Sequence, residues 1–212
     1  MSPNRIMRML QAAIVADAFG VPYEFKQRGT YTVAPEMVGG GFWEQAPGTW
    51  SDDTALTLAL LDHLTHADSY AKLMDRLTAY METGAYTPTG QLFDIGNACA
   101  KAIRTYVIEQ AEPTMCGDPS EFANGNGALM CLAPLAVALY AEPRFVTRAK
   151  SYRAYTQMTH RHPRAVLGSV IYLETLWQLL HGKSLTQALM AVNFSLVALP
   201  RDEQAELPTF KR

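Results

Sequence analysis

A hydroxyl and two carboxylates follow one another at Ser51, Asp52 and Asp53, just after a Pro-Gly pair that favours a turn. The next run, residues 55–64, is apolar with helical periodicity, so both aspartates are expected in the first turn of a helix capped by Ser51. Three hard oxygen donors on one rigid turn are the ligands that Mg²⁺, Ca²⁺ and Mn²⁺ prefer. Acidic residues also complement the dipole of ordinary helices, and on this stretch alone capping is the commoner explanation.

A glycine-rich stretch, Asn124-Gly125-Asn126-Gly127, runs into an apolar segment, residues 128–141, that we expect to be a buried helix. Free backbone N–H groups and the positive end of a helix dipole would make this turn a cradle for phosphate or diphosphate. Asn-Gly repeats also form plain turns, so the motif by itself is a weak signal. It lacks the Gly-Lys-Ser/Thr ending of a P-loop.

Two further carboxylates precede the acidic turn. Asp17 is expected in the last turn of a helix over residues 6–19, where the helix dipole disfavours a negative charge. It therefore requires a partner, which is a backbone donor, a cation or a metal-bound water. Glu24 follows in a long Gly- and Pro-rich connection, residues 20–48, of a length that often forms a lid or a binding loop. On spacing alone, a solvated loop residue is the commoner explanation for Glu24.

Asp94 is expected near the start of a helix over residues 90–109, where stabilisation of the first turn and a functional role explain it equally well. His160 and His162 flank an interruption before another helix, residues 165–181. Two histidines near a helix start can bind metal, although a polar turn between helices is the commoner explanation.

The elements that position these groups are all expected to be helices, because no segment shows a convincing strand pattern or an internal repeat. The prediction is an all-α domain of about eight helices. From residue 201 onward the chain is charged and without pattern. The expected helices cover residues 6–19, 55–64, 70–82, 90–109, 128–141, 144–159, 165–181 and 184–199.

Composition predicts one globular domain over residues 1–212, since 49% of the residues are hydrophobic and only 18% are charged. The net charge is −2 without a run of Lys or Arg, so neither a nucleic acid nor a membrane is an expected partner. Three cysteines without C-x-x-C spacing predict reduced thiols in a cytoplasmic protein. The longest apolar stretch, residues 128–141, is too short to span a membrane.

Taken together and in order, four motifs resemble those of the ADP-ribosylglycohydrolase family. Residues 16–25, ADAFGVPYEF, resemble the family's Gly-Asp-Ala-x-Gly helix end and its glutamate loop. Residues 48–54, GTWSDDT, resemble its (Ser/Thr)-Asp-Asp-Thr metal motif, and residues 124–130, NGNGALM, resemble its phosphate loop. Thr159-His160 resembles a later Thr-His pair that lines the ligand cleft. The resemblance covers nearly the whole chain.

The resemblance implies a compact, orthogonal all-α bundle that hydrolyses the glycosidic bond between ADP-ribose and an acceptor, such as a protein arginine or a small molecule. It also implies a binuclear Mg²⁺ or Mn²⁺ site, because two such cations can hold a ribose diol and activate a water. Carboxylates would stabilise the oxocarbenium-like transition state. The residues predicted to serve this chemistry are Ser51, Asp52 and Asp53 as metal ligands, Glu24 and Asp94 as catalytic groups, and Gly125, Asn126, Gly127, Met130 and His160 as ligand-binding groups.

Three departures from the family pattern qualify these expectations. Ala16 stands where Gly is usual, and Cys131 stands where Arg is common. The Asp-x-Asp-Thr motif that supplies the remaining metal ligands in the family does not occur in this sequence. We therefore expect either a domain that is incomplete at its C-terminus or a natural short form with half a metal site. Besides ADP-ribose or an ADP-ribosylated substrate, the expected partner is a missing C-terminal segment or a second copy. Helices that would pack against a missing segment are expected to expose apolar surface, for example along residues 165–180.

Three hypotheses about function follow. The chain is a metal-dependent ADP-ribosyl hydrolase, an ADP-ribose-binding module that cannot turn over, or a helical scaffold without chemistry. The scaffold is the least favoured, because a scaffold has no need of five carboxylates near one cleft. They are Asp17, Glu24, Asp52, Asp53 and Asp94.

Overall fold

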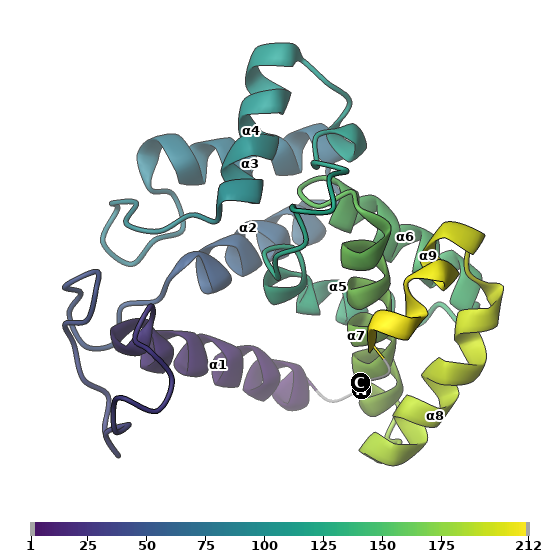
Figure 1. Cartoon of the computed structure of the whole chain (residues 1–212), viewed down its shortest axis with the longest axis horizontal. Coiled ribbons are helices and arrows are strands. Elements are labelled where there is room, and N and C mark those ends of the chain that lie inside the picture. The colour runs from purple at the N-terminus through teal and green to yellow at the C-terminus, as the bar shows by residue number, and fades with distance from the viewer. Residues whose placement is uncertain (1–2, 211–212) are drawn as a thin grey trace.

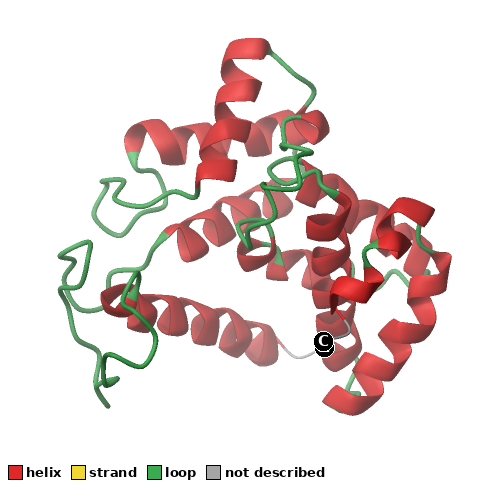
Figure 2. Cartoon of the chain, in the orientation of Figure 1, coloured by secondary structure: helices red, strands yellow, loops and turns green. Residues whose placement is uncertain are grey.

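The computed structural model describes residues 3–210, and its regular elements are helices, as predicted (Figures 1 and 2). The described part of the chain has no strand beyond two isolated bridges. None of its helices combines the length and the apolar character needed to cross a membrane. The α-helices are α1 (Pro3–Gly20), α2 (Asp52–His66), α3 (Tyr70–Thr83), α4 (Asn97–Glu109), α5 (Ala133–Ala138), α6 (Phe145–Gln157), α7 (Pro163–Leu180), α8 (Leu185–Ser195) and α9 (Arg201–Ala205). Short 3₁₀ helices are η1 (Val21–Tyr23), η2 (Pro113–Met115), η3 (Leu129–Cys131), η4 (Leu196–Ala198) and η5 (Leu207–Phe210).

Helix α7 organises the core and packs against α5, α6, α8 and α9 (Figure 1). Its apolar residues recur every three or four positions, so Val166, Leu167, Val170 and Leu173 share one face and are buried. The expectation of exposed apolar surface along residues 165–180 is therefore wrong. A series of exposed large apolar side chains lies instead on and beside α8, at Leu185, Leu189, Met190, Phe194 and Val197.

Helix α2 carries the acidic turn into the molecule. Ala55, Leu56, Ala59 and Leu60 are buried, so the helix is held along most of its length by apolar packing. It contacts α3 and α5, and α1 lies on the side away from α3 (Figure 1). The helix ends at Ala67, whose left-handed backbone (φ 50°) breaks the hydrogen-bonding pattern. This packing fixes the direction of the acidic N-terminus.

Two expected helices are shorter than predicted. The helix expected over residues 90–109 begins only at Asn97, because Gly90 has φ 71° and the chain stays irregular through Gly96. Asp94 therefore lies in a loop and not in a first helical turn. The helix expected over residues 128–141 is divided into η3 and α5, since Pro134 has no N–H to donate to a continuous helix.

The segment after residue 200 shows no pattern in the sequence, and it nevertheless forms α9 and η5. Glu203 of α9 is buried and pairs with Arg153 of α6 through two hydrogen bonds. These residues are 50 positions apart. A contact between residues so far apart in the sequence produces no local periodicity, so the sequence pattern does not predict it.

A buried ion pair ties α6 to α7. Arg148 and Glu174 are 2% and 0% exposed, and two N–H groups of the guanidinium donate to the carboxylate at 2.9 and 2.6 Å. The guanidinium lies 3.7 Å from the ring centre of Trp177, and its remaining terminal nitrogen donates to the carbonyl of Glu142. Gln178 donates a further hydrogen bond to Glu174. Both side chains are buried within the protein. Removal of one therefore leaves the other charge with neither a counterion nor contact with water.

We predict that Glu174→Ala lowers the free energy of unfolding by about 3–5 kcal/mol, because the Arg148 guanidinium remains buried without a counterion. Urea denaturation followed by circular dichroism measures the change. Lys72→Ala is the matched control, since Lys72 pairs with Asp75 on the surface with 63% of its side chain exposed. Its loss is expected to cost less than about 1 kcal/mol. Equal effects of the two substitutions would contradict the prediction.

Candidate active site

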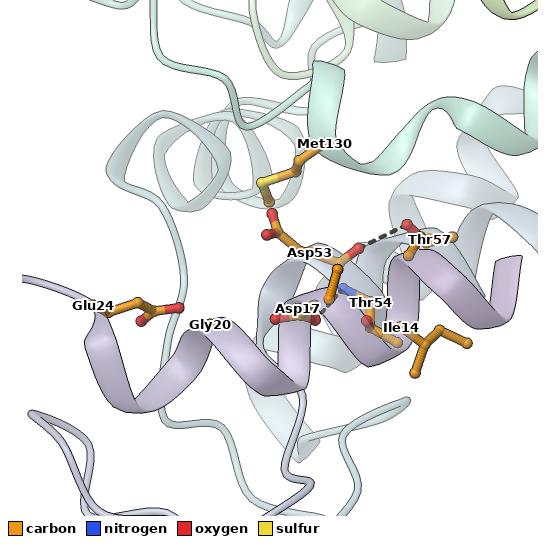
Figure 3. A pocket seen from close by; sticks show the side chains of 10 residues that line it. Ile14, Asp17, Gly20, Glu24, Asp53, Thr54, Thr57 and Met130 are labelled. Atoms are coloured by element: carbon orange, nitrogen blue, oxygen red, sulfur yellow. Dashed lines mark hydrogen bonds between the residues drawn. The ribbon is translucent and has the colours of Figure 1, made fainter. Parts of the chain in front are cut away.

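The acidic turn is held by a carboxylate from another helix. Asp17, in the last turn of α1, accepts hydrogen bonds from the Ser51 backbone N–H (3.1 Å) and the Ser51 hydroxyl (2.7 Å). It also accepts one from the Thr54 backbone N–H at 3.0 Å (Figure 3). The partner that Asp17 requires is thus a set of donors at the start of α2, where the helix dipole favours a negative charge. Ser51 is the N-cap, as predicted, and its hydroxyl oxygen accepts from the Asp53 N–H at 3.4 Å.

Asp52 is buried and held from the opposite side. Its Oδ2 accepts a hydrogen bond from the Gly96 N–H at 3.1 Å. The loop that supplies this donor is fixed by Tyr80, which is buried and whose hydroxyl donates to the carbonyl of Asp94. Burial, and next the charge of Asp94, raise the pKa of Asp52 to about 6. The loop before α4 therefore brings Asp94 to the acidic turn.

Asp53 has the most perturbed carboxyl group of the turn. Its side chain accepts no hydrogen bond from any residue between 3 and 210 and extends toward the Met130 thioether (Figure 3). Burial raises its pKa to about 7, and the charges of Asp17, Asp52 and Glu24 add to the effect. This carboxylate has free lone pairs and unrelieved repulsion, which makes it available to a cation.

Glu24 follows η1 and lies across from the acidic turn (Figure 3). The indole N–H of Trp43 donates to its carboxylate at 2.6 Å, and the Trp43 ring packs edge-on against Phe25 and Phe42. Burial raises the pKa of Glu24, while the hydrogen bond from Trp43 lowers it in part. The long connection between α1 and α2 thus contributes a cluster of aromatic side chains that holds the Glu24 carboxylate in place.

The glycine-rich loop forms the facing wall. It leads into the single 3₁₀ turn η3 and not into a long α-helix, so its predicted alignment with a strong helix dipole is wrong. A Cβ atom at Gly127 would lie 2.9 Å from Cε1 of His160 and 3.1 Å from Sγ of Cys99, which leaves no room for a side chain. His160 is itself buried, and burial lowers its pKa to about 4, so the imidazole is neutral at pH 7.

One cavity of about 420 Å³ lies between these walls, and we call it the loop-side cavity. All ten residues predicted from the sequence line it, although their roles remain predictions. They are Glu24, Ser51, Asp52, Asp53, Asp94, Gly125, Asn126, Gly127, Met130 and His160. A second cavity of about 370 Å³, the α1-side cavity, shares Glu24, Asp53 and Met130 with the first and extends between α1 and α2 (Figure 3).

Sequence reasoning did not find two groups at the loop-side cavity. Phe122 lines it with 99% of its surface exposed, and Phe25, which also lines it, is exposed as well. Cys99 lines it from α4, and burial raises the pKa of this thiol to about 12. A single phenylalanine in a polar loop and a single cysteine in a helix carry no spacing signal, so only the fold places them.

The donor set of the acidic wall fits a hard divalent cation. Its groups are carboxylate and hydroxyl oxygens, and within residues 3–210 none of the five carboxylates forms a salt bridge with Lys, Arg or His. In the same part of the chain, no three Asp, Glu, His or Cys side chains converge closely enough to chelate a metal ion by themselves. Ser51, Asp52 and Asp53 therefore suit a cation that keeps several waters or takes ligands from elsewhere.

Comparison with known proteins places this chain in a family and supports its all-helical fold. The sequence model described as ADP-ribosylglycohydrolase matches residues 2–207. The chain is 34% identical over 136 residues to "ADP-ribosylarginine hydrolase Tri1" of Pseudomonas putida (strain GB-1), covering 63% of this chain and 36% of that protein. It is 31% identical over 164 residues to "ADP-ribosyl-[dinitrogen reductase] glycohydrolase" of Rhodospirillum rubrum, covering 76% of this chain and 52% of that protein.

A solved structure, "ADP-ribosylglycohydrolase-related protein complex", matches with a TM-score of 0.70 and 30% identity over 87% of this chain and 58% of that one. The fold and the cleft thus define an all-helical protein of the ADP-ribosylglycohydrolase type. The chain belongs to the ADP-ribosylglycohydrolase family, which confirms the resemblance found in the motifs. It matches from about a third to a little over half of the length of these relatives.

We predict that Asp53→Asn stabilises the protein at pH 8 when divalent cations are absent. The pKa of Asp53 is higher in the folded state, about 7, than its ordinary value of 3.8, so folding loses stability as the pH rises between these values. The gain should be a few degrees in melting temperature at pH 8, where roughly 1 kcal/mol corresponds to about 2–4 °C. It should shrink toward pH 4.

Differential scanning fluorimetry in EDTA measures this difference, and the control is Asp202→Asn at an exposed position of α9. A destabilised Asp53→Asn protein, or a gain that is constant from pH 8 to pH 4, would show that repulsion at Asp53 does not govern the effect.

Proposed function

We propose that this chain forms the substrate cleft of an ADP-ribosyl glycohydrolase that acts on the bond between ADP-ribose and an arginine side chain. The observation that carries the proposal is the loop-side cavity, in which an acidic wall faces the glycine-rich loop across one space. The name of the relative from P. putida supports arginine as the acceptor.

The glycine-rich loop is proposed to bind the diphosphate. Backbone N–H groups around Gly125, Asn126 and Gly127 can approach an anion closely, because glycine brings no side chain between them and the ligand. His160 lies directly behind Gly127 and is neutral, so it contributes a hydrogen bond and not a positive charge. Met130, which lines both cavities, separates the phosphate end from the α1-side cavity.

Ser51, Asp52 and Asp53 are proposed to hold Mg²⁺ or Mn²⁺. When bound, a divalent cation at such a site orients the ribose hydroxyls and polarises a water. It would also neutralise the repulsion that raises the pKa values of Asp52 and Asp53. These same residues line the cavity that the glycine-rich loop faces, so the ribose would lie between the loop and the acidic turn.

Glu24 and Asp94 are proposed to act on the anomeric carbon. Glu24 is anchored by Trp43 at the boundary of the two cavities, where its carboxylate can accept a proton from the attacking water. The bond between the anomeric carbon and the guanidinium nitrogen breaks, and the water oxygen bonds to that carbon. The proton taken by Glu24 passes to the departing guanidine. The Asp94 carboxylate stabilises the positive charge that develops on the sugar.

A second function, ADP-ribose binding without turnover, is favoured by one observation. No three potential ligand side chains within residues 3–210 converge on a metal. Release of ADP-ribose from an arginine conjugate at saturating Mg²⁺ or Mn²⁺ distinguishes the two functions. We expect little release by the 212-residue chain alone and more with a polypeptide that supplies an Asp-x-Asp-Thr motif. Full turnover by the chain alone would mean that Glu24 or Asp94 completes the site.

We predict that Gly127→Val weakens ADP-ribose binding at least tenfold, because the new side chain meets His160 and Cys99 and fills the loop. Isothermal titration calorimetry measures the affinity, and circular dichroism checks that the helices are intact. Gly168→Ala is the control, since a Cβ there makes only ordinary contacts with Phe210, 3.6 Å away. If Gly127→Val binds ADP-ribose as tightly as the wild type, the glycine-rich loop does not bind the diphosphate and is only a turn.

We also predict that replacing both Asp52 and Asp53 by alanine abolishes Mn²⁺ binding, since it removes both carboxylates of the proposed site. Calorimetry or paramagnetic broadening by Mn²⁺ measures this loss. Asp62→Ala is the control, because Asp62 lies near the other end of α2 and pairs with Arg76. If Mn²⁺ binds the double variant as tightly as the wild type, the cation is held elsewhere.

A further inference from the structure

Asp17 has a bonding pattern that the proposed chemistry does not use. Its Oδ1 accepts from the N–H and the hydroxyl of Ser51, and its Oδ2 accepts from the N–H groups of Ser51 and Thr54. The Ser51 N–H is shared between the two oxygens, so three donors occupy most of the about four acceptor sites of this carboxylate. Asp17 is therefore committed mainly to donors at the start of α2, beside the acidic turn.

The hydroxyl of Ser51 has a single proton, and that proton is donated to Asp17 at 2.7 Å. The lone pairs of the same oxygen then face the Asp53 N–H and the loop-side cavity, which Ser51 lines. Without Asp17 the hydroxyl would be free to rotate and to direct its proton toward the cavity. A proton in that direction would repel a cation.

We propose that Asp17 is a positioning residue, which orients the Ser51 hydroxyl and thereby sets the affinity of the Ser51–Asp53 turn for a divalent cation. This inference rests on the proposed function. It assigns to the end of α1 a role in preparing the site without contact with the cation, the ribose or the reacting atoms. The contact also fastens α1 to the start of α2 and brings Glu24, seven residues further on, to the same cavity.

The identity of the side chain matters because all three groups that face Asp17 are donors. Asn at this position has the same shape but presents two N–H donors in place of one oxygen. In Asp17→Asn the NH2 group faces either the Ser51 hydroxyl or the N–H groups of Ser51 and Thr54, so some of these donors lose their acceptor in either orientation. Ser51→Ala removes the same hydroxyl while leaving the bonds from Asp17 to the backbone intact.

The test is Mn²⁺ affinity, measured by the loss of the free-ion electron paramagnetic resonance signal for the full chain and its variants. We expect Asp17→Asn to weaken binding at least tenfold. Met9→Ala, which loosens the apolar packing of α1 without reaching the turn, should change it less than twofold. If Asp17→Asn does not fold, Asp17→Glu replaces it, since its longer side chain keeps the charge but displaces the oxygens. The same direction of change is expected.

A double-mutant cycle identifies the route of the effect. If Asp17 acts through the Ser51 hydroxyl, the Asp17→Asn/Ser51→Ala protein should bind no more weakly than Ser51→Ala alone, and Ser51→Thr should retain wild-type affinity. Additive losses, or wild-type affinity in the folded Asp17 variants, would overturn the positioning role while leaving the metal site in place. Absence of Mn²⁺ binding by the wild type would overturn the proposed metal site and this inference together.

Discussion

Crowding of negative charge in a partly dehydrated cleft is the constraint on which the arrangement of this protein depends. Burial raises the pKa values of Glu24, Asp52, Asp53 and Asp94, and the charges of neighbouring carboxylates add to the effect. In the described chain Asp17, Glu24 and Asp52 accept hydrogen bonds from N–H and hydroxyl donors, and none of the five carboxylates pairs with a cationic side chain. The cleft is thus built to hold unneutralised charge, which is the property that a divalent cation would require.

The two walls of the loop-side cavity differ in charge, and the difference suits the proposed ligand. The glycine-rich wall offers neutral donors, since burial keeps His160 uncharged. A diphosphate bound there would lie near the acidic wall, and the repulsion between them would have to be offset. A cation at Ser51, Asp52 and Asp53 would offset it, so the two halves of the proposed function support each other physically.

The packing that holds this charge in place lies away from the cleft. The Arg148–Glu174 pair and the apolar face of α7 fix α6 and α7 to each other. The apolar face of α2 holds the acidic turn from behind, and the Asp17 contact joins α1 to it. The long connection between α1 and α2 has little regular structure of its own, and its aromatic cluster of Phe25, Phe42 and Trp43 serves to place Glu24.

Sequence by itself determined the all-helical class and the capped acidic turn, because these depend on local periodicity and capping chemistry. The ten predicted site residues followed from the resemblance of short motifs to a family, and the fold brings them to one cavity, while their roles stay predictions. Tertiary structure alone decided where Asp17 finds its donors, since they come from a different helix 34 to 37 residues away. It also decided that α4 begins after Asp94 and that α9 forms at all, through a loop held by Tyr80 and a pair between Arg153 and Glu203. The physical reason is the same in each case: the free energy of a long-range polar contact has no counterpart in the spacing of neighbouring residues.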